Sequence, residues 1–355
     1  MKNKKIMVAM SGGVDSSAAA FLLQKKGFEV IGVYMRLFDN QGNSEDAARR
    51  VCQKLGIKFY PVNLAEKFKQ EVIEYFVDSY RDGITPNPCV KCNKLIKFGE
   101  MFRIMNELEC DYLATGHYIK LEKKFSFGKF KFINKLFRGH DASKDQSYFL
   151  YNLTQEQLGN IIFPLGAFEK TEIKKIASAE ELPTLSGESQ DVCFLNIDGK
   201  IAEHNEYLRE YIKQAPGPIK TLAGEIIGEH QGLSFYTLGQ RRGVEIGGTG
   251  PYYVVKMDQE NNTLYVSSDH DDPALYVSEL MMQEANWIAG AEPKFTFACE
   301  AVIRYRHKEV KCVVEKIKTN KFLVKFSEPQ RAVMPGQSVV LYCGDELIGG
   351  GVIGA

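Results

Sequence analysis

The segment IMVAMSGGVDSS, residues 6–17, decides the fold of this 355-residue chain. Its five apolar residues predict a buried strand, a glycine pair follows, and a helical pattern over residues 16–26 ends at Gly27. Glycine lets the backbone turn tightly, and the amide groups at the start of a helix attract negative charge. The segment therefore predicts a strand, a turn that binds a phosphate or pyrophosphate group, and a helix.

Two features of this turn limit its chemistry. Asp15 stands beside the predicted anion site, where a carboxylate makes most sense if a divalent cation bridges it to the phosphate. The lysine of the Walker motif is missing, which disfavours a kinase or GTPase of that type. An ordinary strand-to-helix turn, with glycine for geometry and serine or aspartate as a cap, is the structural alternative.

Strand-like and helical patterns alternate through the first part of the chain. Strands are predicted at residues 30–35, 58–62 and 112–114, and helices at 45–55 and 65–80. This alternation is typical of an α/β domain with a doubly wound parallel sheet and helices on both faces. Residues 118–139, where phenylalanines alternate with polar residues, break the pattern and predict an inserted β-hairpin.

Glycine and proline punctuation replaces the helical signal after about residue 200. Strand-like runs at 252–256 and 263–267 predict a small central domain over residues 203–274. Further strand-like runs lie at 295–304, 311–318, 322–326 and 339–342. They predict a C-terminal β-barrel over residues 275–355, which leaves residues 1–202 for the domain with the phosphate-binding turn.

The composition excludes several classes of protein. The 45 Lys and Arg balance the 45 Asp and Glu, so the chain is not a uniformly basic nucleic-acid coat. No apolar run is long enough to span a membrane or to form a signal peptide, and we expect a soluble cytoplasmic protein. Positive charge is local: residues 301–326 hold eight basic and two acidic residues, and 120–138 hold seven and one. Such segments suit phosphate contacts or a solvated surface equally well.

Three of the eight cysteines stand in turn-rich polar sequence and are the candidates for chemistry. They are Cys89 and Cys92, in TPNPCVKCNK, and Cys193, in SQDVCF. Lysines before and after Cys92, at 91, 94 and 97, would favour the thiolate, which is the nucleophilic form. A structural zinc site is the alternative for the Cys-x-x-Cys pair, but zinc usually takes four ligands and no second pair is suitably spaced.

Seven motifs, in the same order along the chain, resemble those of the tRNA-specific 2-thiouridylases. They are residues 11–17, 85–88 with 92–93, 114–118, 144–150, 189–194, 238–241 and 335–337. The first of them also resembles the PP-loop of other ATP pyrophosphatases, such as GMP synthetases and argininosuccinate synthetases. The cysteines and the later motifs narrow the resemblance to the thiouridylases, whose first domain has the fold of the adenine nucleotide alpha hydrolases.

The resemblance implies an ATP-dependent tRNA-uridine 2-sulfurtransferase. In that family ATP adenylates the C2 oxygen of the wobble uridine, and sulfur then replaces this oxygen as AMP leaves. Cys193 would receive a persulfide from a sulfur-carrier protein or a cysteine desulfurase. Cys92 would release the sulfur by forming a transient disulfide with Cys193. The implied cofactors are ATP and Mg²⁺, and the implied partner is tRNA, whose target base leaves its stack for the reaction.

The resemblance also assigns binding residues. The predicted ATP contacts are Ala9, Met10, Ser11, Gly12, Gly13, Val14, Asp15, Ser16, Met35 and Gly116. The predicted pocket for the target base consists of Asn87, Pro88 and Cys89. The predicted tRNA contacts are His117, Lys144, Asp145, Gln146, Arg304, Tyr305 and Gln337.

The chain departs from the family at Cys89, where many members carry aspartate. This third thiol gives a second hypothesis, in which Cys89, Cys92 and Cys193 ligate an iron–sulfur cluster whose open iron carries the sulfide. Another PP-loop ligase that acts on a small metabolite is a further alternative, and it predicts turnover without RNA. An RNA-binding module that keeps the fold but does no chemistry predicts no lost activity on Cys92→Ser.

Overall fold

Strand β1 (Lys5–Met10) is the centre of a five-stranded parallel sheet with the order β3-β2-β1-β4-β7. The computed structural model describes residues 4–38, 41, 43–126, 131–185, 192–197, 200–201, 204–244, 246, 250–294 and 296–354. The other strands of this sheet are β2 (Glu29–Arg36), β3 (Lys58–Asn63), β4 (Tyr112–Ala114) and β7 (Ile161–Ile162). The chain leaves β1 toward β2 on one side and returns to β4 on the other, so β1 and β4 border the switch point where such sheets bind ligands.

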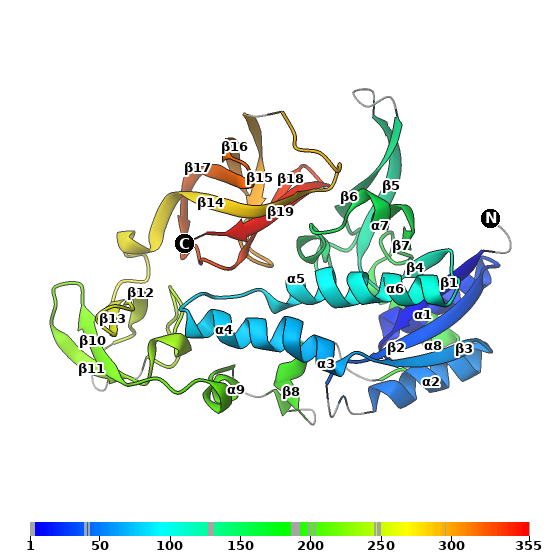
Figure 1. Ribbon diagram of the computed structural model, residues 1–355, viewed down its shortest axis with the longest axis horizontal. Coiled ribbons are helices and arrows are strands. Elements are labelled where there is room, and N and C mark those ends of the chain that lie inside the picture. Colours follow the sequence, from blue (N-terminus) through cyan, green and yellow to red (C-terminus); the bar gives the residue numbers. More distant parts are fainter. Residues whose placement is uncertain are drawn as a thin grey trace.

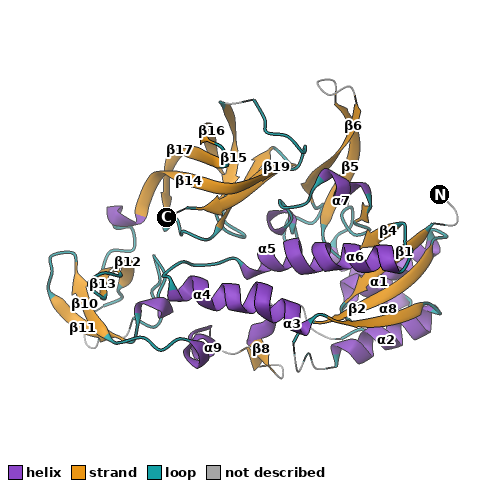
Figure 2. Cartoon of the chain, in the orientation of Figure 1, coloured by secondary structure: helices purple, strands orange, loops and turns teal. Residues whose placement is uncertain are grey.

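Alternate residues of β1 face two different helical layers. Ile6, Val8 and Met10 share a buried cluster with residues of α1 (Val14–Lys25) and α2 (Ser44–Leu55). Met7 belongs to the cluster on the opposite face, where Figure 2 shows two long helical rods side by side. One rod consists of α3 (Ala65–Phe68), the π-helical η1 (Lys69–Glu74) and α4 (Tyr75–Arg81). The other consists of α5 (Pro88–Cys92), the π-helical η2 (Asn93–Glu100) and α6 (Met101–Glu107). The predicted doubly wound sheet is confirmed.

The turn-rich setting predicted for Cys89 and Cys92 is wrong, because both residues lie in helix α5. The turn signals come from the residues that start this helix. Asn87 is its N-cap, and Pro88 occupies the first helical turn, where its missing amide costs nothing.

The predicted hairpin is confirmed by β5 (Ile119–Ser126) and β6 (Lys131–Arg138), although residues 127–130, at its turn, lie outside the described residues. Strand β6 pairs with β19 of the C-terminal barrel, so the hairpin extends the sheet of that barrel (Figure 1).

The predicted C-terminal barrel is confirmed, and it is closed by the pairing of β14 with β19. Its strands are β14 (Tyr276–Trp287), β15 (Phe297–Val302), β16 (Val310–Lys318), β17 (Lys321–Arg331), β18 (Ser338–Cys343) and β19 (Glu346–Ile353). Sequence patterns missed β19, where glycines 349–351 weaken the strand signal. They are needed for close packing, since a Cβ at Gly350 would lie 2.7 Å from Val339 O and 2.9 Å from the Tyr151 ring.

A smaller sheet with the order β11-β10-β13-β12 lies between these two regions in the sequence. Its strands are β10 (Gly217–Thr221), β11 (Ile226–His230), β12 (Tyr253–Asp258) and β13 (Thr263–Ser267). Further helices among the described residues are η4 (Ser147–Phe149), α7 (Gln155–Gly159), α8 (Lys170–Ala179), η5 (Cys193–Leu195), α9 (His204–Tyr211), η6 (Leu233–Phe235) and η7 (Pro273–Leu275). Two short strands, β8 (Asn196–Ile197) and β9 (Lys200–Ile201), form a separate pair.

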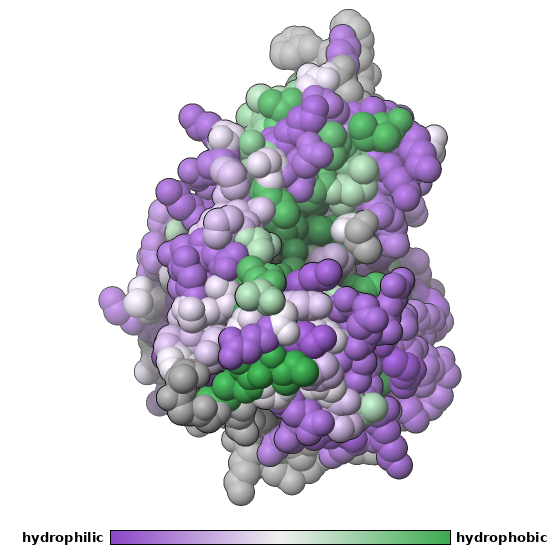
Figure 3. All heavy atoms as spheres, turned by 90° about the vertical axis from the view of Figure 1, so that its left-hand side faces the viewer, coloured by the Kyte–Doolittle hydropathy of each residue, from purple (hydrophilic) through white to green (hydrophobic). Residues whose placement is uncertain are grey.

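The surface is hydrophilic over most of the face in Figure 3, and apolar residues gather in a hollow near its middle. Within the described part of the chain, no helix is long and apolar enough to cross a membrane.

Candidate functional site

The turn after β1 is held in one shape by its own glycines and serines. Gly12 has a φ of +77°, and a Cβ there would collide with Ser44 O, so the turn requires glycine at this position. Ser16 Oγ accepts a hydrogen bond from Ser11 N at 3.1 Å and donates one to Gly13 O at 3.2 Å. The turn therefore presents the first amide groups of α1 in a fixed geometry, which suits a phosphate.

The predicted ATP residues outside this turn lie at the same edge of the sheet. Gly116 follows β4, and a Cβ there would lie 2.9 Å from Ser16 N and 3.0 Å from Asp15. Met35 lies near the end of β2, which pairs with β1. The structure thus brings the predicted nucleotide residues together at the switch point of the sheet, and ATP binding itself stays a prediction.

Asp15 is neutralised by a lysine that sequence analysis missed. Lys170 Nζ lies 2.6 Å from both carboxylate oxygens of Asp15, and the Tyr118 hydroxyl donates to Oδ1 at 2.7 Å. The Lys170 side chain is only 9% exposed, and its backbone amide donates to Asp141 at 3.0 Å. No local pattern links residues 155 positions apart. The divalent cation predicted beside Asp15 stays a prediction, since Lys170 occupies both oxygens here.

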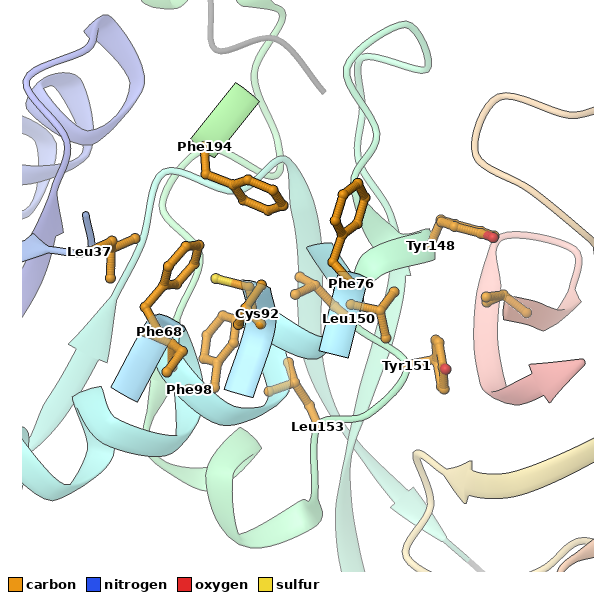
Figure 4. Packing of buried hydrophobic residues seen from close by; sticks show 14 of the residues in the cluster. Leu37, Phe68, Phe76, Cys92, Phe98, Tyr148, Leu150, Tyr151, Leu153 and Phe194 are labelled. Carbon is orange, nitrogen blue, oxygen red and sulfur yellow. The ribbon is translucent and has the colours of Figure 1, made fainter. Parts of the chain in front are cut away.

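Cys92 lies in the apolar core of the first domain. Its side chain is 6% exposed, and Figure 4 shows it among Phe68, Phe98 and Phe194. Burial raises the pKa of the Cys92 thiol to about 12, and Lys97 opposes this rise. At neutral pH the buried thiol is therefore protonated in this conformation.

Cys193 is brought to Cys92 by the residue that follows it. Phe194 packs on Phe68 at 5.9 Å between ring centroids and on Phe76 at 5.2 Å. The Cys193 side chain is exposed, yet burial raises the pKa of its thiol. Both observations fit a side chain that reaches solvent while many protein atoms surround its sulfur, because desolvation of a thiol depends on the protein packed around it.

The three candidate thiols occupy one region of the molecule. Cys89 lies one helical turn before Cys92, and its side chain is partly exposed. Charges on Cys193 and on Cys89 both raise the pKa of Cys92, after the larger effect of burial, so both thiols lie within electrostatic range of it. Residues 189–191 of the motif around Cys193 lie outside the described residues.

The three cysteines do not fit an iron–sulfur cluster in this arrangement. Across the described ranges, no group of three His, Cys, Asp or Glu side chains is placed to hold a metal ion.

A π-helical turn supplies the cation of the cysteine site. Helix η2 begins directly after Cys92, and in a π-helix residues that are five apart lie one turn apart. Lys97, five residues after Cys92, lowers the pKa of both Cys92 and Cys193, against the larger effect of burial. Lys91 and Lys94 instead line a cavity of about 390 Å³ between α4, α5 and the barrel. Of the three lysines predicted to favour the thiolate, Lys97 is the one whose charge lowers the pKa of both thiols.

His117 is a buried neutral side chain. Its Nδ1 lies 2.8 Å from Thr115 Oγ1, and burial, aided by Lys97, lowers its pKa to about 3. The next residue is tied to another predicted tRNA contact, because Tyr118 N donates to Gln146 Oε1 at 3.1 Å. A contact of His117 or Gln146 with tRNA stays a prediction.

Other residues predicted to contact tRNA, from the first and last domains, lie side by side. The Tyr305 hydroxyl donates to Asp145 O at 3.3 Å, and the Tyr305 ring packs on Phe149 with centroids 4.5 Å apart. Lys144 and Arg304, which precede Asp145 and Tyr305 in the sequence, are partly buried. The structure brings these two predicted segments together without testing their contact with tRNA.

Gln337 joins the barrel to the loop in front of α5. Its Nε2 donates to Thr85 O at 3.3 Å and to Pro86 O at 2.9 Å. Asn87 follows this loop and caps α5 by accepting a hydrogen bond from Val90 N at 3.2 Å. The barrel therefore holds the segment that is predicted to line the pocket of the target base.

Models of known families match nearly the whole chain. The model described as "tRNA methyl transferase HUP domain" matches residues 4–197, and "tRNA methyl transferase PRC-barrel domain" matches 205–268. The model described as "Aminomethyltransferase beta-barrel domain" matches residues 277–353.

Curated relatives are similar along their full length. The chain is 39% identical to the tRNA-specific 2-thiouridylase MnmA of Idiomarina loihiensis, over 99% of this chain and 96% of that protein. It is 41% identical to the protein of the same name from Shouchella clausii, over 99% and 97%. A solved 4-thiouridine synthetase, in complex with RNA and ATP, aligns with a TM-score of 0.37 and 20% identity over 58% of this chain and 50% of that one.

Proposed function

The chain belongs to the family of tRNA-specific 2-thiouridylases, and from that premise we propose that it exchanges the C2 oxygen of the wobble uridine of tRNA for sulfur. The reaction has two parts: ATP activates the C2 oxygen as an adenylate, and a sulfur nucleophile then expels AMP. The proposal requires a nucleotide site and a sulfur site within reach of one flipped base.

One observation carries the proposal: the two sites are linked through adjacent residues. Gly116 lies against the phosphate-binding turn, within contact distance of Ser16. The next residue, His117, is affected by the charge of Lys97, and the same lysine acts on both Cys92 and Cys193. A base placed near His117 would therefore have the nucleotide site on one side and the thiols on the other.

For the activation step, the turn at residues 11–16 would hold the phosphates of ATP with its amide groups. Lys170 supports this assignment, since it puts a nearly buried positive charge beside Asp15 at the same place. Mg²⁺, when bound, would neutralise phosphate charge beside the Asp15 carboxylate.

For the sulfur step, the different solvent exposure of Cys193 and Cys92 suggests a different role for each. Cys193 is exposed, so a sulfur-carrier protein or a cysteine desulfurase could load it with a persulfide. Cys92 is buried and out of reach of such a donor. Its thiolate would attack the inner sulfur of the Cys193 persulfide, forming a Cys92–Cys193 disulfide and releasing the outer sulfur as sulfide. The sulfide adds at C2, and AMP leaves with the former C2 oxygen.

The test is mass spectrometry of tRNA nucleosides after incubation with ATP, Mg²⁺ and a persulfide donor. Wild type is expected to yield 2-thiouridine at the wobble position. Cys92→Ser and Cys193→Ser are expected to abolish it while ATP binding persists. Cys343→Ser is the matched control, because Cys343 is an exposed cysteine of the barrel. Thiolation by Cys193→Ser at the wild-type rate would refute the persulfide assignment.

A further inference from the structure

We propose that Cys89 is a resolving thiol, which transfers the disulfide from Cys92–Cys193 to Cys89–Cys92 and so frees Cys193 for the next persulfide. This inference rests on the proposed function, because its substrate is the disulfide that the proposed sulfur step leaves behind. It assigns to Cys89 a redox role beyond lining the base pocket.

Cys89 and Cys92 have the spacing that a disulfide requires. Both lie in α5, three residues apart. Helix geometry puts Cα atoms at this spacing about 5 Å apart, within the range of about 4.4–6.8 Å that disulfides span. The first turn is fixed by its own sequence, because Pro88 restricts the backbone and the Asn87 side chain accepts from Val90 N at 3.2 Å. The pair can therefore close with side-chain rotation and little movement of the helix.

Cys92 lies within electrostatic range of both other thiols. Its pKa is affected by charge on Cys89, from its own helix, and by charge on Cys193, from η5. The anchor of Cys193 does not depend on the disulfide, since Phe194 packs on Phe68 and Phe76. Breaking the Cys92–Cys193 bond would leave Cys193 in place, ready to be loaded again.

The exchange is balanced without an oxidant. The Cys89 thiolate attacks Cys92 Sγ, the bond between Cys92 and Cys193 breaks, and its electron pair leaves on Cys193 as a thiolate. One disulfide is consumed and one is formed. An external dithiol then reduces Cys89–Cys92, and is itself oxidised to a disulfide, so two thiols are restored.

The solvent exposure of the three cysteines explains the advantage of resolving the disulfide through Cys89. An external thiol that attacked the exposed Cys193 would form a mixed disulfide on the very sulfur that must accept the next persulfide. Cys92 is 6% exposed and offers no alternative point of attack. Cys89 is partly exposed, so the mixed disulfide would form there and Cys193 would stay available.

The test maps disulfides during a reaction with limiting external dithiol. Samples are quenched in acid, free thiols are alkylated, and disulfide-linked peptides are identified by mass spectrometry. Wild type is expected to show the Cys92–Cys193 peptide first and the Cys89–Cys92 peptide after it. Cys89→Ser and Cys89→Asp, the second with the residue common in the family, are expected to accumulate Cys92–Cys193. Cys110→Ser, which removes a buried cysteine from the loop between α6 and β4, should show the wild-type order.

Three outcomes would overturn the inference. The first is wild-type protein that clears Cys92–Cys193 without ever forming Cys89–Cys92. The second is a Cys89→Ser protein that clears it at the wild-type rate. The third is anaerobically purified protein with iron and sulfide bound to the three thiols, which would make Cys89 a ligand. Absence of both the Cys92–Cys193 disulfide and thiolated tRNA would instead refute the proposed function, and the resolving step with it.

Discussion

The turn that is proposed to bind phosphate and the cysteine site differ in how they treat charge. At the turn, Lys170 Nζ lies 2.6 Å from each oxygen of Asp15, so a pair of opposite charges is present before any ligand arrives. At the cysteine site, burial raises the pKa of Cys92 to about 12, and Lys97 opposes it. The turn thus holds a paired positive charge before any anion binds, whereas the cysteine site keeps the thiol that is proposed as the nucleophile protonated and shielded. The comparison teaches that sulfur transfer needs a step that deprotonates the Cys92 thiol, whereas phosphate binding at the turn needs no such step.

Removing Lys170 should have the largest effect on this contrast. Lys170→Met would leave the Asp15 carboxylate without its cation, so it would repel the phosphates of ATP. By analogy with the loss of one preorganised charge donor, we expect ATP affinity and pyrophosphate release to fall by about 100-fold. Isothermal titration with ATP and Mg²⁺, without tRNA, measures the affinity. Lys175→Met, which removes an exposed lysine of the same helix, is the matched control, and equal affinities of the two variants would contradict the assignment.

Removing Lys97 should impair sulfur transfer at the cysteine site and leave ATP binding at the turn unchanged. Lys97 lowers the pKa of Cys92 and of Cys193, so Lys97→Met would let both pKa values rise. The thiolate fraction at a fixed pH then falls about tenfold for each unit of rise, and the pH profile of sulfur transfer moves to higher pH. Rates of Cys193 alkylation and of tRNA thiolation between pH 7 and 9 measure the shift.

The control for Lys97 is Lys94→Met, because Lys94 lines the cavity between α4, α5 and the barrel and is not among the charges that shift the pKa of Cys92 or Cys193. The Lys94 variant should keep the wild-type pH profile and both variants should bind ATP normally. If Lys94→Met moved the profile as far as Lys97→Met, the π-helical placement of Lys97 would not be the cause.

His117, the residue after Gly116, should make folding stability depend on pH. Its pKa is about 3 in the folded protein, against 6.5 for an ordinary histidine. Between these values the unfolded chain binds a proton that the folded protein does not, so stability falls as the pH falls, by about 1.4 kcal/mol per pH unit. His117→Gln should reduce this slope in urea unfolding between pH 4 and 6, and a smaller slope should remain because burial also lowers the pKa of His204, to about 4. His270→Gln, at an exposed histidine, is the control, and a slope unchanged by His117→Gln would contradict the assignment.

The sequence predicts a site best when the residues of that site lie close together along the chain. The turn between β1 and α1 was predictable because its strand, its glycines and the start of its helix lie within residues 6–17. Lys170 was not, because its partner is 155 residues away and only the folded sheet joins them. Cys92 and Cys193 were identified through their motifs, but nothing in the sequence distinguished Lys97 from Lys91 and Lys94. That choice depends on the π-helical turn, which shifts residue 97 relative to an ordinary helix.

The smallest effect is expected where the barrel supports the loop in front of α5. This support concerns the cysteine site and not the turn after β1. Gln337→Ala removes two hydrogen bonds to the carbonyl oxygens of Thr85 and Pro86, which hold the loop in front of α5. At about 1 kcal/mol for a typical hydrogen bond, a several-fold loss in the thiolation rate is expected, with ATP affinity unchanged. Gln330→Ala is a matched control, since Gln330 also donates to two carbonyl oxygens, but within its own strand. An equal loss of thiolation in both variants would mean that barrel stability, and not the position of the loop, limits sulfur transfer.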